Sequence, residues 1–175
     1  MTTNLDRAGL VSRHVEIESV VLTRILMETQ LDPLEMPEEL RLTQRFRCTY
    51  EVPASQPDRL HVRVELGVDA SQPEEVQDRD ALVHLRAQYL AVYRLDDPGS
   101  YPEDALRHFA ELNGTYNVWP YWRELVHTSA ARAGLTNMLV PVFRPPIRQA
   151  ATPEQVSPSE PPALPPQENS DERSE

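Results

Sequence analysis

The chain has 175 residues and a formal net charge of −11 at pH 7, and this length predicts a single domain. The acidic balance argues against nucleic acids and anionic membrane surfaces as direct partners. The single cysteine, Cys48, excludes an internal disulfide framework and a cysteine-rich zinc site.

The N-terminal residues 1–13 predict a flexible start without regular structure. They also lack the basic region followed by an apolar run that a secretory signal peptide has. No run of the sequence has the apolar length that a membrane-spanning helix needs. We therefore expect a cytoplasmic protein that does not insert directly into membranes.

Residues 15–28, VEIESVVLTRILME, predict a strand because they are rich in β-branched residues. Simple alternation places one apolar set on one face: Val15, Ile17, Val21, Ile25 and Met27. It places a second apolar set on the other face: Val20, Leu22 and Leu26. A strand that is apolar on both faces is usually covered on both. The cover is either a subunit contact or, for a central strand, the rest of a monomer, and the sequence leaves both open.

Three further segments alternate between apolar and polar residues, which is a strong strand signal: residues 41–52, 59–69 and 83–95. Strands with one apolar and one polar face are typical of an antiparallel meander with helices on a single side. The predicted fold is α+β, with a four-stranded antiparallel sheet followed by two helices packed on one face.

The first predicted helix spans residues 102–113, and the pair Asn113-Gly114 predicts its end. Its apolar face is formed by three residues: Ala105, Phe109 and Leu112. The second helix begins at Asn117 as its N-cap and ends at Gly134 as a left-handed residue. Residues 145–175 are rich in proline, glutamate and serine, so we expect a disordered tail after a domain of residues 14–144.

The second helix carries both tryptophans of the chain. Helical spacing predicts one buried stripe: Val118, Trp122, Leu125, Val126, Ser129 and Ala133. Trp119 and Tyr121 lie off this stripe, beside the start of the helix. We therefore expect Trp122 and Leu125 to hold the helix on the sheet, and Trp119 and Tyr121 to present aromatic surface to a partner.

This region also carries a resemblance to a known family. The motif combines an aromatic residue, a helix-entry proline and a fixed exit: Trp119, Pro120-Tyr121, Arg123-Glu124, Arg132 with Gly134, and Val140-Pro141-Val142. It resembles the second helix of SecB, the bacterial protein-export chaperone, and the order of elements is similar from residue 15 to residue 143. The resemblance implies a homotetramer built as a dimer of dimers. It also implies an ATP-independent holdase that binds unfolded or precursor proteins and supports their translocation.

The resemblance further implies that the second helix and the loop before it roof an apolar groove for the client chain. The matching positions are Tyr116, Trp119, Tyr121, Trp122, Leu139, Val140, Met27 and Phe46. Subunit contacts are expected at Val20, Leu22, Phe109 and Leu112. Rigid aromatic side chains suit such a groove because they offer large contact area at low entropic cost.

One departure from the family concerns the SecA motor, to which SecB delivers clients through acidic residues on the exposed sheet face. Two of those acidic positions align with Arg24 and Arg86 here, and a third is kept as Glu28. Reversed charges would replace attraction with repulsion, which puts delivery to SecA in doubt. Some SecB-like proteins serve instead as dedicated chaperones of an antitoxin, and this chain could be one.

No catalytic residue, metal site or cofactor is predicted. His61 and His84 lie on the polar faces of consecutive strands and could be neighbours, but no third ligand at a fixed spacing completes a site. Cys48 falls on an apolar strand face, which does not suit an activated nucleophile. Two alternative functions remain, a module that binds a small apolar ligand and an oligomeric scaffold without a client.

Overall fold

The computed structural model describes residues 4–32, 34–73, 81–135 and 138–143 of the chain. The chain divides into two units, residues 1–145 and residues 146–175, and every described residue belongs to the first. The disordered tail predicted for residues 145–175 lies outside the described residues.

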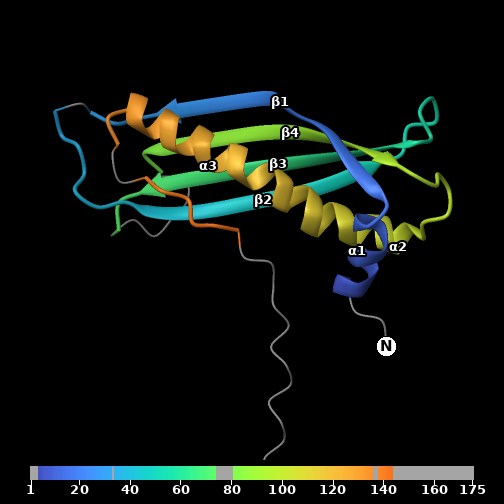
Figure 1. The fold of residues 1–175 in the computed structure, drawn as a ribbon. Helices are drawn as coiled ribbons and strands as arrows, with labels where there is room; N and C mark the ends of the chain where they lie inside the picture. The colour runs from blue at the N-terminus through green and yellow to red at the C-terminus, as the bar shows by residue number, and fades with distance from the viewer. Residues whose placement is uncertain (1–3, 33, 74–80, 136–137, 144–175) are drawn as a thin grey trace, which may run out of the picture. The chain divides into compact units, whose positions relative to one another are not determined.

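Four antiparallel strands form one sheet: β1 (Val15–Thr29), β2 (Arg41–Glu51), β3 (Arg59–Ser71) and β4 (Val83–Leu95). Their order across the sheet is β1-β4-β3-β2, so β2, β3 and β4 form a meander and β1 lies beside β4 (Figure 1). The predicted fold class, with its helices on one face of a four-stranded antiparallel sheet, is confirmed. The alternative of a central position for β1 is wrong, because β1 is an edge strand of the described sheet.

The long helix α3 (Thr115–Arg132) crosses one face of the sheet (Figure 1). Apolar residues of β3 and β4 on that face are almost fully enclosed: Leu60, Val62, Val64, Val68, Val83, Leu85, Tyr89 and Tyr93. The helix contributes Val118, Trp122 and Val126, none of which is more than 1% exposed. The other face, called the open face below, carries the alternate, mainly polar residues of the strands, and no described helix covers it.

Bulges in β1 change which of its side chains face the helix. The pairing between β1 and β4 shifts register twice, and cross-strand partners point to the same face. Val20 and Leu22 consequently face the helix together with Ile17 and Ile25, whereas Val21 lies on the open face. The predicted faces of Val20, Leu22 and Val21 are therefore wrong, because an extra residue in a strand reverses the alternation beyond it.

The N-terminal residues form a helix, α1 (Asn4–Ser12), where the sequence predicts a flexible start for residues 1–13. Ala8 and Val11 are 3% and 0% exposed, and α1 packs against α2 (Glu103–Phe109). The prediction of a loose start is therefore wrong for α1. So short a helix is stabilised mainly by tertiary packing, which its own sequence does not reveal.

The predicted break at Asn113-Gly114 is absent. The chain continues from α2 through a π-helical segment, η2 (Ala110–Gly114), into α3, and Gly114 has helical angles of φ −59° and ψ −49°. A Cβ at residue 114 would lie 2.5 Å from Cγ1 of Val62, so glycine here permits the close approach of the helix to β3. Asn117 is consequently not an N-cap, and its side-chain amide donates a 3.0 Å hydrogen bond to the hydroxyl of Tyr93.

The end of α3 is where the sequence predicts it. Gly134 has φ +79°, and its N–H donates to the carbonyl of Ala131 at 3.1 Å. The N–H of Leu135 donates to the carbonyl of Ala130 at 2.9 Å. These two bonds form a Schellman motif, which requires the left-handed residue that glycine supplies at low cost. No helix among the described residues is long and apolar enough to cross a membrane.

Candidate functional site

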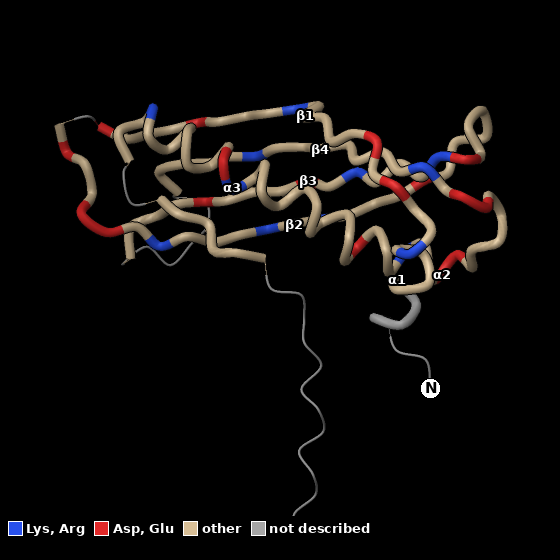
Figure 2. Tube along the Cα trace, viewed as in Figure 1, with Lys and Arg blue, Asp and Glu red and all other residues tan. Residues whose placement is uncertain are grey.

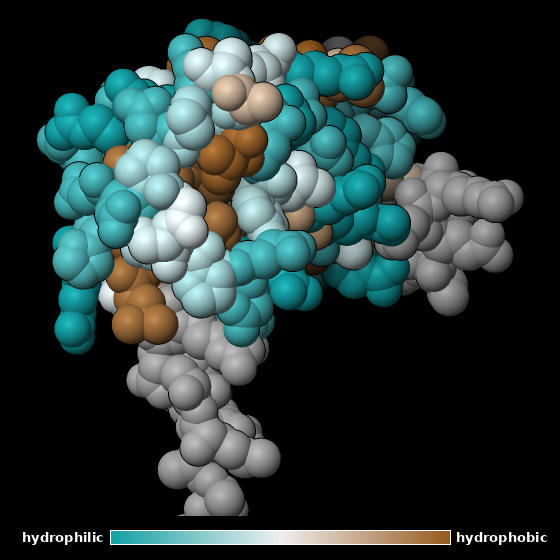
Figure 3. Space-filling model, turned by 90° about the vertical axis from the view of Figure 1, so that its right-hand side faces the viewer, coloured by the Kyte–Doolittle hydropathy of each residue, from teal (hydrophilic) through white to brown (hydrophobic). Residues whose placement is uncertain are grey.

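A groove of about 580 Å³ opens between β1, the start of α3 and the segment that follows α3. Its walls are formed by Ile17, Val20, Tyr116, Asn117, Trp119, Pro120, Tyr121, Arg123, Val142 and Phe143. Only Asn117 and Arg123 carry strongly polar side chains, so the groove offers mainly aliphatic and aromatic surface. On the side of the molecule that carries α1 and α2, apolar side chains reach the surface between polar neighbours (Figure 3).

Val142 and Phe143 form one wall of the groove. They end the segment Met138–Phe143, which runs back along α3 and is tied to it by two hydrogen bonds. The indole Nε1 of Trp119 donates to the carbonyl of Pro141 at 2.8 Å, and Nε of Arg123 donates to the carbonyl of Val140 at 3.0 Å. The ring of Phe143 lies 5.2 Å from that of Trp119. These contacts give an irregular segment a defined place and satisfy the polar end of the tryptophan.

Tyr116 and Tyr121 form the accessible aromatic surface of the groove. They are 58% and 52% exposed, whereas Tyr89 and Tyr93 on the sheet are 3% and 1% exposed. Both lie in the first turns of α3. The hydroxyl group of each tyrosine can contact water while its ring stays exposed. The structure thus brings Tyr116, Trp119 and Tyr121 together, three of the eight residues that the sequence places in a groove.

Trp119 differs from expectation in its burial. It is 9% exposed, although it lies off the stripe that the helical spacing predicts. The reason is the segment after α3, since Pro141 and Phe143 cover the indole from the side that the stripe leaves open. The ring therefore has little free surface, contrary to the expectation that Trp119 is hard to bury and presents its aromatic surface to a partner.

The other predicted groove residues lie elsewhere. Trp122 and Val140 are 1% and 4% exposed and belong to the core, so neither reaches the groove. Leu139 is 61% exposed but does not line it. Met27 is partly buried near the far end of β1, and Phe46 lies on β2, at the opposite edge of the sheet.

Sequence reasoning missed seven residues of the groove wall: Ile17, Val20, Asn117, Pro120, Arg123, Val142 and Phe143. Val142 and Phe143 continue the apolar exit of the helix, and that apolar run was the one signal that could have included both. Ile17 was placed on a strand face without a role. Simple alternation predicts Val20 on the face away from the helix, at a subunit contact. The bulges that turn it toward α3 could not be predicted from the sequence.

The residues expected at subunit contacts differ in their exposure. Leu22 is 42% exposed on β1 and remains accessible. Phe109 is 1% exposed, with its ring 5.0 Å from that of Tyr93, so it lies in the core and cannot meet a partner. Val20 and Leu112 are partly buried. The apolar surface of β1, more than that of α2 and η2, is thus available for assembly.

The two candidate metal ligands are not neighbours. His61 and His84 share the open face, but His84 pairs across the strands with Asp69, four same-face positions along β3 from His61. The Nδ1 atom of His84 lies 2.7 Å from Oδ1 of Asp69. In the described part of the chain, no three histidine, cysteine or acidic side chains gather as metal ligands would.

Cys48 faces the core side of β2, as its strand alternation predicts. Burial is the main cause that raises the pKa of its thiol to about 12, with the charge of Glu111 as a second cause. Its Sγ lies 3.3 Å from the carbonyl of Ala110 and can donate to it. A neutral thiol held in this way packs β2 against η2.

The sequence matches no protein-family model and no curated protein. The structure, however, is similar to that of the Mycobacterium tuberculosis Rv1957 SecB-like chaperone, solved in complex with a peptide from the antitoxin HigA1. The TM-score is 0.68 at 15% sequence identity, over 80% of this chain and 98% of that one. The chain therefore has a SecB-like fold. A protein of unknown function from Streptococcus agalactiae gives a TM-score of 0.38 at 8% identity over 74% of this chain and 96% of that one, which supports no argument.

Proposed function

We propose that this protein is an ATP-independent chaperone that binds unfolded polypeptides in the groove between β1 and α3. The observation that carries the proposal is the groove itself, which is open, apolar and bordered by the exposed rings of Tyr116 and Tyr121. An unfolded chain offers scattered apolar and aromatic side chains. A groove that demands few defined hydrogen bonds can accept many such sequences.

The SecB-like fold supports the same proposal, since the similar mycobacterial protein is a chaperone that binds a polypeptide segment. We further propose a cytoplasmic homotetramer. Several grooves on one assembly would bind one long client more tightly than a single groove does, through their raised effective concentration.

Two client systems are compatible with this mechanism. The first is protein export, in which the chaperone would deliver precursors to the SecA motor. The second is a single antitoxin, which the complex of the similar mycobacterial chaperone favours. Arg24 and Arg86 also favour the second system. Both lie on the open face, where SecA would have to be attracted by acidic residues, and their positive charges would oppose that attraction.

A refolding experiment tests the holdase activity. A chemically unfolded test enzyme is diluted with and without the protein, in the absence of ATP, and light scattering and recovered activity are followed. We expect sub-stoichiometric oligomer to suppress aggregation. The double variant Tyr116→Ala/Tyr121→Ala should lose most of this effect while keeping its circular dichroism spectrum, because both rings are half-exposed.

Leu34→Ala is the matched control, since Leu34 is 92% exposed and does not line the groove. Equal suppression by the tyrosine variant and the control would refute the groove as the client site. Native mass spectrometry of the purified protein addresses the remaining alternative. A bound small molecule of constant mass would indicate a module for an apolar ligand instead.

A further inference from the structure

The open face of the sheet carries a cluster of four arginines, Arg24, Arg45, Arg47 and Arg86, called the arginine cluster below. The strand register places them in two adjacent rows. Arg24 and Arg47 lie at the two ends of one row, with Gln88 and Glu65 between them. Arg86 and Arg45 lie in the next row, about 7 Å along the strands, on either side of Gly67. Figure 2 shows basic positions on β1, β4 and β2.

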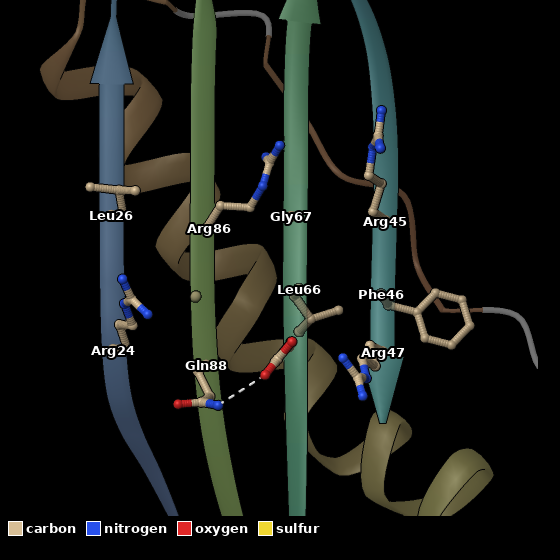
Figure 4. Close-up of a pocket in the computed structure, with 11 residues that line it drawn as sticks. Arg24, Leu26, Arg45, Phe46, Arg47, Leu66, Gly67, Arg86 and Gln88 are labelled. Atoms are coloured by element: carbon tan, nitrogen blue, oxygen red, sulfur yellow. Dashed lines mark hydrogen bonds between the residues drawn. The ribbon is translucent and has the colours of Figure 1, made fainter. Parts of the chain in front are cut away.

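These side chains surround a hollow of about 420 Å³ (Figure 4). Its floor is Gly67, where a Cβ would lie 2.8 Å from Cδ of Arg86. The absence of a side chain at residue 67 therefore allows the Arg86 side chain to extend across β3 at this point. Leu26, which is 44% exposed, adds apolar surface to the rim. The ring of Phe46 points away from the hollow at the edge of the sheet (Figure 4).

The two rows differ in how their charges are balanced. Arg86 donates to both carboxylate oxygens of Asp69, at 2.7 and 2.9 Å, and Arg45 lies 3.6 Å from the same carboxylate. Asp69 is buried, so this row is a fixed, partly neutralised support. Arg24 and Arg47 are exposed, and among the described residues neither has a hydrogen bond or ion pair. Glu65 between them accepts a 3.1 Å hydrogen bond from Gln88.

The cluster is opposite in sign to the chain as a whole. Its four arginines face two carboxylates, those of Glu65 and Asp69, on a protein whose formal net charge is −11. Guanidinium groups bind carboxylates through two parallel hydrogen bonds, which gives them geometric as well as electrostatic selectivity. A local positive patch on an acidic protein therefore attracts acidic ligands at this face and repels them elsewhere.

We propose that the arginine cluster binds an acidic polypeptide segment of a partner protein. Carboxylates of the segment pair with Arg24 and Arg47, and an apolar side chain enters the hollow against Leu26. A polypeptide fits better than a nucleic acid, because Glu65 lies between the two exposed arginines and would repel a continuous line of phosphates. The site lies on the face opposite the groove, so the proposal is independent of the holdase activity.

The test measures binding of a fluorescein-labelled synthetic peptide, rich in glutamate and containing two leucines, by fluorescence anisotropy at low salt. We expect the full-length protein to bind it, and Arg24→Gln/Arg47→Gln to weaken binding by at least about tenfold, as loss of charge-assisted pairs does. The matched control is Arg107→Gln/Arg132→Gln, which removes the same net charge from exposed helical positions. It should change the affinity by less than about twofold.

Several outcomes would overturn the proposal. One is equal weakening by the two double variants, which would mean that net charge alone drives binding. Another is equal binding of a peptide with glutamine in place of glutamate. Tighter binding of a labelled single-stranded oligonucleotide would assign the cluster to nucleic acid. Tighter binding of a peptide with the sequence of residues 150–175, which holds six acidic residues and one arginine, would assign it to this chain's own C-terminal segment.

Discussion

Tyr121 and Trp122 are neighbours on α3 with opposite surroundings, since Tyr121 is 52% exposed and Trp122 is 1% exposed. Adjacent residues on a helix point about 100° apart, so one can face the core while the next faces solvent. The same turn of α3 thereby holds the helix on the sheet through Trp122 and offers an aromatic ring to the groove through Tyr121. The core and the candidate site therefore meet at this turn. For a substitution at either residue, both the free energy of unfolding and the affinity for client must be measured.

We expect Trp122→Ala to lower the free energy of unfolding by about 3–5 kcal/mol, as removal of a large buried aromatic does. Tyr121→Ala should change it by less than about 1 kcal/mol and weaken client binding by about 1–2 kcal/mol. Urea unfolding and client binding, measured side by side, check both values. A stable Trp122→Ala variant that fails to bind client would mean that the roles of these two residues are reversed.

Buried hydroxyl and thiol groups predict a loss of stability at alkaline pH. Burial is the main cause that raises the pKa of Tyr93, Tyr89 and Cys48 to about 12 each. The folded protein therefore holds these protons at pH values where the unfolded chain releases them, and stability falls as the pH rises above about 9. Urea unfolding between pH 8 and 11 should show this decline.

Tyr93→Phe provides the check on that interpretation. It removes one of the three titrating groups and should make the decline between pH 9 and 11 shallower, although it also leaves the side-chain amide of Asn117 without its hydroxyl acceptor. An unchanged slope in this variant would show that Tyr93 does not contribute to the alkaline transition.

At the scale of an element, α2, η2 and α3 form one continuous helical run whose middle is fixed by contact with the sheet. Gly114 is a poor helix former, and yet its absent side chain lets η2 lie against Val62. The π-helical segment adds one residue to a turn and so changes which side of the run faces the sheet beyond it. The face that α3 presents to the core is therefore decided at Ala110–Gly114.

We expect Gly114→Ala to destabilise the protein by about 1–3 kcal/mol, because the new Cβ overlaps Val62. Gly9→Ala in α1 is the matched control. A Cβ at residue 9 meets no atom within 4 Å, so alanine should be neutral or stabilising by up to about 1 kcal/mol. Thermal unfolding of the two variants checks this contrast, and destabilisation by both would show that helix geometry rather than contact with Val62 is the cause.

At the scale of the whole molecule, β1 has apolar surface on both faces and lies at the edge of the sheet. Ile17, Leu22 and Ile25 on the helix side and Val21 and Leu26 on the open face are all between 42% and 48% exposed. A long apolar edge strand is a ready surface for pairing with another chain. This observation agrees with association of the chain with a second copy, and it favours a contact at β1 over one at Phe109.

Sedimentation velocity should show the assembled protein at micromolar concentration. Val21→Asp should shift it to a smaller species with an unchanged circular dichroism spectrum, because Val21 is 48% exposed and a charge at a packed contact is unfavourable. Gln44→Asp on β2, also exposed, is the control and should leave the assembly intact. A monomeric wild-type protein would refute the assembly.

Patterns within a single element were enough to predict a large part of this protein. Alternation in β2, β3 and β4 identified the sheet and its buried face, because side-chain direction in a regular strand is set by the backbone alone. Spacing on α3 placed Val118, Trp122 and Val126 in the core, and glycine at residue 134 located the helix end, for the same local reason. Tyr121 could be proposed as an accessible aromatic because it lies off the buried stripe beside the helix start, whereas the same argument failed for Trp119. Tyr116 followed only from the resemblance to the second helix of SecB.

Contacts between distant segments decided what the sequence could not. The bulges of β1 depend on its pairing with β4, the helical conformation of Gly114 on its contact with β3, and the burial of Trp119 on a segment some twenty residues later. The arginine cluster likewise exists only because the sheet places β1 beside β4. Local preferences fix the direction of each side chain within its own element. Which surfaces meet is determined by tertiary packing, whose energies exceed those preferences.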